Sequence, residues 1–201
     1  EPDQSSGLKK LEELADGPLK QTPAFLNALN ALKPTLDYDD LFAKSLQNHQ
    51  VVLGYIFTTA QEGTQEVEAG QLPPPTVSAE DAKAYSFLKY RHRQGYAANL
   101  SKFQNTAKAA GHFNEMPDPD GIVRRTPMLY SYKNALYESL SLAVARIALG
   151  VPHVELGINH EGGHSSLDYL RLGDRTIPVN PLLQAFVPYR GKWGSSFPYF
   201  S

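Results

Sequence analysis

His160, Glu161 and His164 stand in the order H-E-x-x-H, which is the pattern of zinc-dependent hydrolases. That chemistry needs both histidines on one face of a helix, where they bind the metal, and a glutamate that activates a water molecule. Gly162 and Gly163 occupy the two middle positions, and two adjacent glycines weaken a helix by roughly 2 kcal/mol relative to alanine. We therefore expect a glycine-rich hairpin tip with two exposed histidines and no metal. A zinc-dependent hydrolase that uses this segment stays the alternative function.

A second group of charged residues consists of Asp118, Asp120, Arg124 and Arg125. The two aspartates belong to the run Pro-Asp-Pro-Asp-Gly, whose residue types favour a tight turn. A calcium loop of the EF-hand type is excluded, because the glycine and the glutamate required at its sixth and twelfth positions are absent. We expect one arginine to pair with an aspartate and brace the turn, while the other faces solvent. The same four residues are candidate ligand-binding residues for an anionic or zwitterionic molecule.

Composition narrows the remaining classes of function. Basic and aromatic residues alternate over residues 83–108, which can bind single-stranded nucleic acid, but no ribonucleoprotein signature accompanies them and the formal net charge is -2. We therefore expect a solvated helical face there and no nucleic acid partner. The absence of cysteine excludes disulfides, thiolate metal sites and cysteine nucleophiles. No phosphate-binding loop or nucleophile elbow occurs, and we expect no cofactor and no catalytic residue.

The elements that must position these residues begin with helices. Apolar residues at helical spacing predict three of them: one from Leu8 to the turn at Gly17, one from Pro23 to just before Pro34, and one over residues 38–48. The continuous apolar run at residues 51–57 predicts a strand that is buried on both faces. A helix that leads directly into such a strand indicates an α/β sheet rather than a helical bundle.

Later elements complete a mixed α/β fold. A short helix is expected near residues 101–110, and a longer one over residues 138–149 that packs Leu140, Val144 and Ile147 onto the strand at residues 51–57. Turn residues at 132–135 and 173–174 predict C-terminal β-hairpins. The expected architecture is a central sheet flanked by helices, in a single domain over residues 1–201.

Two consecutive stretches resemble the signature of a known family: residues 111–128, GHFNEMPDPDGIVRRTPM, and residues 137–146, YESLSLAVAR. The family is the second of the CHASE series, the cyclase and histidine-kinase associated sensory extracellular domains. Residues 40–54, 177–191 and 197–201 are also similar to it. The resemblance spans most of the chain, and residues 58–110 match it weakly.

The resemblance implies a periplasmic, extracytoplasmic sensory domain in a bacterial inner-membrane receptor, joined to its effector by flanking transmembrane helices of the same chain. It implies no catalytic residues in this domain. The full-length protein would be a nucleotide cyclase or a protein kinase, such as a histidine kinase, and an adenylate or guanylate cyclase is favoured. The expected input is an unidentified periplasmic small molecule or physical signal, and a homodimer is compatible with the family. Because members carry a portion that precedes a stretch like Glu1-Pro2-Asp3, we expect an excised, incomplete domain whose sheet lacks N-terminal strands.

Overall fold

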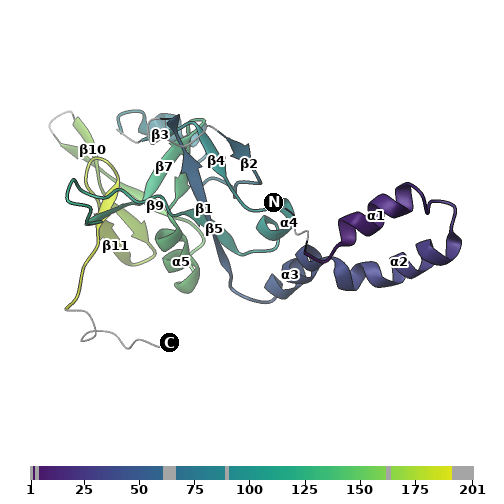
Figure 1. The fold of residues 1–201 in the computed structure, drawn as a ribbon. Helices are drawn as coiled ribbons and strands as arrows, with labels where there is room; N and C mark the ends of the chain where they lie inside the picture. Colours follow the sequence, from purple (N-terminus) through teal and green to yellow (C-terminus); the bar gives the residue numbers. More distant parts are fainter. Residues whose placement is uncertain (1, 3–4, 61–66, 89–90, 162–163, 192–201) are drawn as a thin grey trace. The chain divides into compact units, whose positions relative to one another are not determined.

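The computed structural model describes residues 2, 5–60, 67–88, 91–161 and 164–191 (Figure 1). Its helices and strands are mixed along the chain, which confirms the α/β class that the sequence predicts. The chain divides into two compact units. Unit 1 consists of Glu1–Pro74 and Gln94–His112, and unit 2 consists of Pro75–Arg93 and Phe113–Ser201. A single domain over the whole chain stays a prediction.

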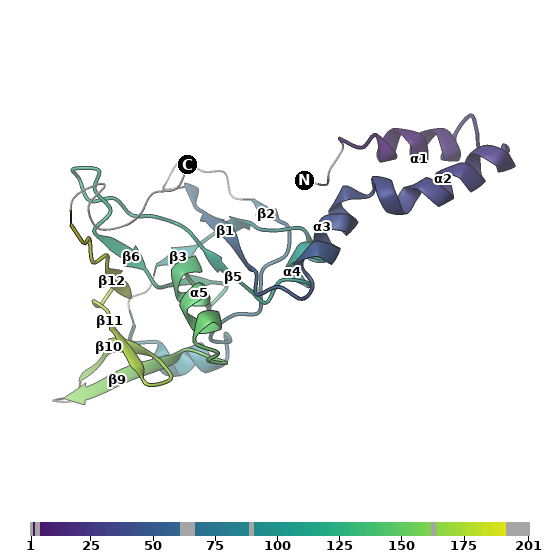
Figure 2. The same ribbon diagram turned by 90° about the horizontal axis from the view of Figure 1, so that it is seen from below.

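Unit 1 begins with the helices α1 (Leu8–Asp16), α2 (Pro23–Leu36) and α3 (Tyr38–Leu46). Figures 1 and 2 show α1 and α2 running side by side, with α3 following α2. The prediction that α2 stops before Pro34 is wrong, since the helix includes this proline and continues to Leu36. A proline removes one backbone donor, and the helical bonding resumes beyond it, where the Asp37 N–H donates to the Lys33 carbonyl at 3.0 Å.

Among the described residues, the sheet of unit 1 has four strands, in the order β2 (Glu68–Ala69), β4 (Gly95–Ala97), β1 (Val52–Thr58) and β5 (Ala109–His112). The strand predicted at residues 51–57 is confirmed as β1, which pairs antiparallel with β4 and parallel with β5. Tyr55 and Phe57, which share one face, are fully buried, whereas Ile56 on the other face is half-buried, so the predicted burial on both faces is met only in part. The helix expected near residues 101–110 is only α4 (Ser101–Gln104), because Ala109 and Ala110 are strand residues paired with β1.

Unit 2 contains three small sheets in the part of the chain that the structure describes. The first has the strand order β3 (His92–Arg93), β7 (Leu129–Tyr132), β8 (Ala135–Glu138), the second pairs β12 (Gln184–Phe186) with β6 (Arg125–Pro127), and the third has the order β11 (Arg175–Pro178), β10 (His164–Leu172), β9 (Glu155–Glu161). A short 3-10 helix, η2 (Asp81–Tyr85), precedes β3.

The predicted C-terminal hairpins are confirmed, and their turns explain them. Lys133 and Asn134 join β7 to β8 with φ angles of 47° and 65°. Two consecutive positive φ values give the turn whose twist matches that of antiparallel strands. Gly173 lies in the turn between β10 and β11 with a φ of 59°. Glycine adopts such a positive φ at little steric cost because it has no Cβ atom.

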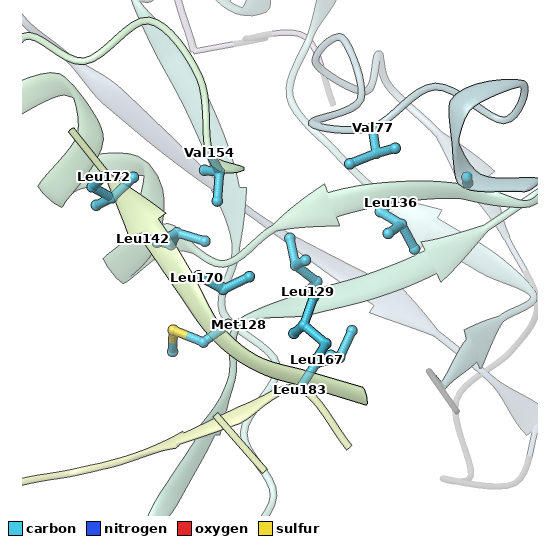
Figure 3. Packing of buried hydrophobic residues seen from close by; sticks show 11 residues of the cluster. Val77, Met128, Leu129, Leu136, Leu142, Val154, Leu167, Leu170, Leu172 and Leu183 are labelled. Carbon is cyan, nitrogen blue, oxygen red and sulfur yellow. The ribbon is translucent and has the colours of Figure 1, made fainter. Parts of the chain in front are cut away.

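The apolar core of unit 2 lies between the helix α5 (Leu140–Ala148) and the strands around it (Figure 3). The expected packing of Leu140, Val144 and Ile147 is wrong, since Val144 is 47% exposed whereas Leu142 is 1% exposed. Leu142 lies in a cluster of unit 2 residues that includes Leu129, Leu170 and Leu172, while β1, the expected partner strand, belongs to unit 1.

The side of α5 that faces the core begins at the residue that caps the helix. The Ser139 hydroxyl caps the helix by accepting a hydrogen bond from the Leu142 N–H at 3.3 Å. Residues 139, 142, 143 and 146 therefore share the inward face at spacings of three and four, and Arg146 on that face is held by Glu138.

No helix within the described ranges has both the length and the apolar character of a membrane span.

Candidate functional site

In unit 2, the turn that contains Asp118 and Asp120 is held by hydrogen bonds from Arg124. The Arg124 Nη1 donates to Asp118 Oδ2 at 3.0 Å and to Asp120 Oδ1 at 2.9 Å, and Nη2 donates to Asp120 Oδ2 at 2.8 Å. The turn closes through the Gly121 N–H, which donates to the Asp118 carbonyl at 2.8 Å. Three of the four candidate ligand-binding residues are therefore brought together, and they form hydrogen bonds with one another.

These contacts fix the charges of the turn. The hydrogen bonds from Arg124, with a further one from the Ile122 N–H, lower the pKa of Asp120 to about 2. The same bonds raise the pKa of Arg124. The Arg124 side chain is nonetheless 43% exposed, so the pair braces a surface turn and is not a buried ion pair. The sequence-based expectation that one arginine pairs with the turn is correct for Arg124.

Arg125 lies away from this group. It stands directly opposite Phe186 in the pairing of β6 with β12, and its guanidinium carbon lies 5.4 Å from the centre of the Phe186 ring. Such a cation–π contact is favourable at an exposed ring, and Phe186 is 72% exposed. Arg125 is thus half-buried against a ring, where the sequence predicted a solvent-facing side chain.

The H-E-x-x-H segment is not helical where the structure describes it. His160 and Glu161 end β9, His164 begins β10, and the two strands pair with Glu161 opposite His164. Gly162 and Gly163 lie outside the described residues. His160 is exposed and its Nδ1 lies 2.8 Å from the Ser165 hydroxyl. The helical face that zinc-dependent hydrolysis needs is therefore not formed, and the described residues include no cluster of three or more acidic or histidine side chains suited to a metal.

The basic and aromatic residues 83–108 do not form one solvated helical face, which corrects that expectation. They are divided among η2, β3, β4 and α4. Arg93 is 6% exposed, with its guanidinium carbon 4.1 Å from the centre of the Tyr130 ring. Lys102, on α4, takes part in a polar network of unit 1 instead.

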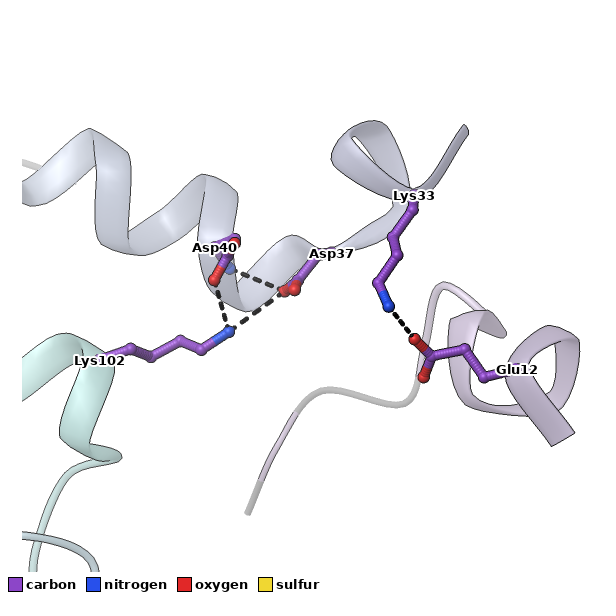
Figure 4. A network of polar contacts seen from close by, with 5 residues as sticks. All are labelled: Glu12, Lys33, Asp37, Asp40 and Lys102. Carbon is purple, nitrogen blue, oxygen red and sulfur yellow. Dashed lines mark hydrogen bonds and ion pairs between the residues drawn. The ribbon is translucent and has the colours of Figure 1, made fainter. Parts of the chain in front are cut away.

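This network joins α3 to α4 (Figure 4). The Lys102 Nζ donates to Asp40 Oδ1 at 2.6 Å and lies 3.4 Å from Asp37 Oδ1. Asp37 also caps α3 by accepting a hydrogen bond from the Asp40 N–H at 2.9 Å. The contact with Lys102 lowers the pKa of Asp40, and the hydrogen bond to Asp40 raises the pKa of Lys102. We refer to Lys102, Asp37 and Asp40 as the Lys102 network.

An aromatic contact reinforces the same junction. The rings of Phe42 on α3 and Phe103 on α4 meet edge to face, with centres 5.1 Å apart. In sequence α3 precedes β1 and α4 precedes β5, and these two strands pair in parallel from Val52 and Ala109 onward. The Lys102 network and the aromatic pair therefore connect the helices that enter the parallel pair of the sheet.

A hollow of about 410 Å³ adjoins the network. Its walls carry both charge signs, from three lysines and three acidic residues: Lys9, Lys33, Lys102, Glu12, Asp37 and Asp39. Lys33 Nζ pairs with Glu12 at 2.5 Å across α1 and α2 (Figure 4). A small polar molecule with charges of both signs matches such walls better than an apolar one does. The sequence does not predict this hollow, because Lys102 is 65 residues away from Asp37 along the chain.

Comparison with protein families matches residues 9–201 to the CHASE2 domain. The match covers both units apart from the first residues of the chain. Neither the search of curated proteins nor the search of solved structures found a match.

Proposed function

The chain belongs to the CHASE2 domain family, and from this premise we propose that it is the extracytoplasmic input domain of a bacterial transmembrane signalling receptor. CHASE2 domains are extracellular sensory domains and not catalytic ones. The observation that carries the proposal is the family match over residues 9–201. We further propose that the domain is periplasmic and that it regulates a cytoplasmic adenylate or guanylate cyclase in the same chain.

The geometry of unit 1 supports a sensory role. The hollow offers charged groups on α1, α2 and α3, and the Lys102 network joins α3 to α4. A ligand that displaces Asp37 or Lys102 would change how these two helices are held. Because α3 and α4 lead into β1 and β5, a change at the hollow can reach the sheet through covalently adjacent elements. No comparable arrangement of described residues favours a hydrolase.

The proposal is tested with the full-length gene product in membranes, by measuring the rate at which cyclic AMP or cyclic GMP forms. Lys102→Met removes the cation of the network while it keeps most of the side-chain volume, and we expect it to change the basal rate. The matched control is Lys83→Met, whose ion pair with Glu80 is on the surface, with side chains 72% and 81% exposed. Membranes that form neither cyclic nucleotide would rule out a cyclase. A rate that responds equally to both variants would rule out input through the Lys102 network.

A further inference from the structure

Met116 in unit 2 lies directly before the Pro-Asp-Pro-Asp-Gly turn and contacts the first residue of β12. The Gln184 Nε2 donates a hydrogen bond to the Met116 Sδ at 3.6 Å. Gln184 is 6% exposed, and this sulfur is the one acceptor that its Nε2 has among the described residues. A thioether sulfur is a weak acceptor. A buried amide donor is therefore directed at a poor partner, which calls for an explanation.

The orientation of the Gln184 amide is fixed by Asn180. The Asn180 Oδ1 accepts hydrogen bonds from the backbone N–H groups of Leu182 and Gln184, at 3.0 Å each. The Asn180 Nδ2 therefore points to the other side, where it donates to the Gln184 Oε1 at 2.9 Å. Because the Gln184 oxygen is engaged there, the Gln184 Nε2 is the atom that faces the sulfur, and it cannot turn away without breaking the bond to Asn180.

Met116 is also the methionine that a dissolved oxidant reaches. The chain has two methionines. Met128 is 6% exposed and belongs to the apolar core of unit 2, whereas Met116 is half-buried and keeps part of its surface in contact with solvent. Oxidation of methionine to its sulfoxide is a reversible modification that favours accessible side chains. The thioether that contacts Gln184 is therefore the one at which we expect this chemistry.

We propose that Met116 is a site of reversible oxidation by peroxides, and that the Gln184 amide selects which of the two sulfoxide epimers forms. A thioether sulfur carries two lone pairs, and the hydrogen bond from Gln184 engages the one on the buried side. The other lone pair attacks a peroxide oxygen. The S–O bond forms as the O–O bond breaks, the sulfur gives two electrons to the peroxide, and the departing hydroxide takes up a proton and leaves as water. A reductase specific for that epimer, supplied with electrons by a dithiol, removes the oxygen as water and restores the thioether.

Oxidation changes how Met116 is held against β12. The oxygen lies on the solvent side of the sulfur and withdraws electron density from it, so the lone pair that faces Gln184 becomes a poorer acceptor. The contact between Met116 and Gln184 is therefore weaker in the sulfoxide. Because β12 pairs with β6, the oxidised sulfur loosens a link between this strand pair and the segment that leads into the turn. The inference depends on neither the proposed cyclase nor the location of the domain.

Peroxide treatment of the folded 201-residue protein, followed by digestion with trypsin, tests the site. Trypsin places Met116 and Met128 on separate peptides, residues 109–124 and residues 126–133. We expect the first peptide to gain one oxygen while the second is unchanged, and a thermal melt should show that the oxidised protein is still folded. Oxidation of the two peptides at the same rate would contradict the proposed site.

The epimers are distinguished by two methionine sulfoxide reductases, each of which reduces one epimer. When they are applied separately to the digested protein, one should return most of the Met116 sulfoxide to the thioether and the other a minor part. The same peptide oxidised after digestion has no amide to select an epimer, and each reductase should return about half of it. Equal halves from the protein that was oxidised while folded would overturn the selection by Gln184.

Two variants remove the donor from the sulfur. Gln184→Leu deletes it. Asn180→Asp keeps the side-chain size and the acceptor for the backbone N–H groups, but it places a carboxylate oxygen against the Gln184 Oε1. The Gln184 amide should then flip and direct its oxygen at Met116. Both variants should give the two epimers in about equal amounts, and thermal melts check that both are folded.

The matched control is Asn105→Asp in unit 1. The Asn105 Oδ1 accepts a hydrogen bond from the Gln71 Nε2 at 2.9 Å, and an aspartate keeps this acceptor. We expect this variant to give the epimer ratio of the wild type. A folded Asn180→Asp protein that also keeps the wild-type ratio would contradict the role assigned to the Gln184 amide.

NMR of the Gln184 side-chain amide measures the effect of oxidation on the contact. A weaker hydrogen bond should move the Nε2 proton signals upfield when the wild type is oxidised, and the signals of Met116→Leu should not respond to peroxide. A downfield movement in the wild type would show that the sulfoxide oxygen itself accepts the bond, and it would contradict the proposed position of the oxygen on the solvent side.

Discussion

Arg146 holds both carboxylate oxygens of Glu138 on the inward side of α5. Its Nε donates to Oε1 and Oε2 at 3.1 Å each, and its Nη2 donates to Oε1 at 2.5 Å. The two side chains are 16% and 8% exposed, and the hydrogen bonds to Glu138 raise the pKa of Arg146. The Arg146 Nη1 also donates a hydrogen bond to the Pro152 carbonyl at 3.4 Å. Arg146, in the last turn of α5, therefore connects the end of β8 at Glu138 to the segment that follows the helix.

Removing one partner of this pair should destabilise unit 2 strongly. Arg146→Ala leaves the Glu138 carboxylate buried without its partner, and we expect the free energy of unfolding to fall by about 3–5 kcal/mol. Glu80→Gln breaks the exposed pair with Lys83 and serves as the control, with a nearly unchanged free energy of unfolding. Urea denaturation measures both. Equal losses in the two variants would show that the Glu138–Arg146 pair contributes no more than a surface contact.

The orientation of α5 makes a second prediction. Leu142→Ala removes a side chain from the core of unit 2 and should lower the free energy of unfolding by about 2–5 kcal/mol. Val144→Asp places a charge at a position that is 47% exposed and should leave the thermal melt nearly unchanged. If Val144→Asp unfolds the protein and Leu142→Ala does not, the helix is rotated relative to the structure described here.

The sequence predicted some of these elements and not others, for physical reasons. The strand β1 is readable because its residues are β-branched and aromatic, and the hairpin at Lys133 and Asn134 is readable because its residues tolerate positive φ. The prediction for the inward face of α5 is wrong because this face includes a charged residue, Arg146, whose partner Glu138 precedes the helix. Apolar periodicity cannot register a charged residue that is buried because it is paired.

The candidate site was predictable only in part. Asp118, Asp120 and Arg124 are close in sequence, so their turn could be predicted from residue types. Lys102 reaches Asp37 and Asp40 over 65 and 62 residues of chain, and no local pattern links them. A site whose residues are far apart in sequence can therefore be identified only from the three-dimensional structure.

The pKa of Asp120 is a third testable quantity. Its ordinary value is 3.8, and the hydrogen bonds from Arg124, together with the one from the Ile122 N–H, lower it to about 2 in the folded protein. A lowered carboxyl pKa stabilises the fold above pH 3.8, and that contribution is lost as the pH falls toward 2. The contribution is small because the pair is exposed. Titration of the side-chain carboxyl carbons by NMR should give about 2 for the wild type and a clearly higher value for Arg124→Gln, still below 3.8 because the hydrogen bond from the Ile122 N–H remains. The same pKa in both proteins would refute the role assigned to Arg124.

The Lys102 network should control the local stability of α3. Without the Lys102 amine, Asp37 and Asp40 lose their shared partner, so Lys102→Met should speed hydrogen exchange at the amides of Tyr38–Leu46. The sheet of β9, β10 and β11 belongs to the other unit and should exchange as in the wild type. Lys83→Met is again the control. Faster exchange throughout the protein would mean that Lys102→Met acts on global stability and not on the junction of α3 and α4.

The location of the domain decides the account as a whole. A single thiol introduced by Ser166→Cys lies at an exposed position of a domain that otherwise has no cysteine. In the full-length protein, with any cysteines elsewhere replaced, intact cells are treated with a membrane-impermeant maleimide, and permeabilised cells give the total labelling. A cytoplasmic thiol protein in the same cells reports any leakage of the reagent. An extracytoplasmic input domain predicts that the thiol is labelled in intact cells to the same extent as after permeabilisation, and labelling that appears only after permeabilisation would contradict it.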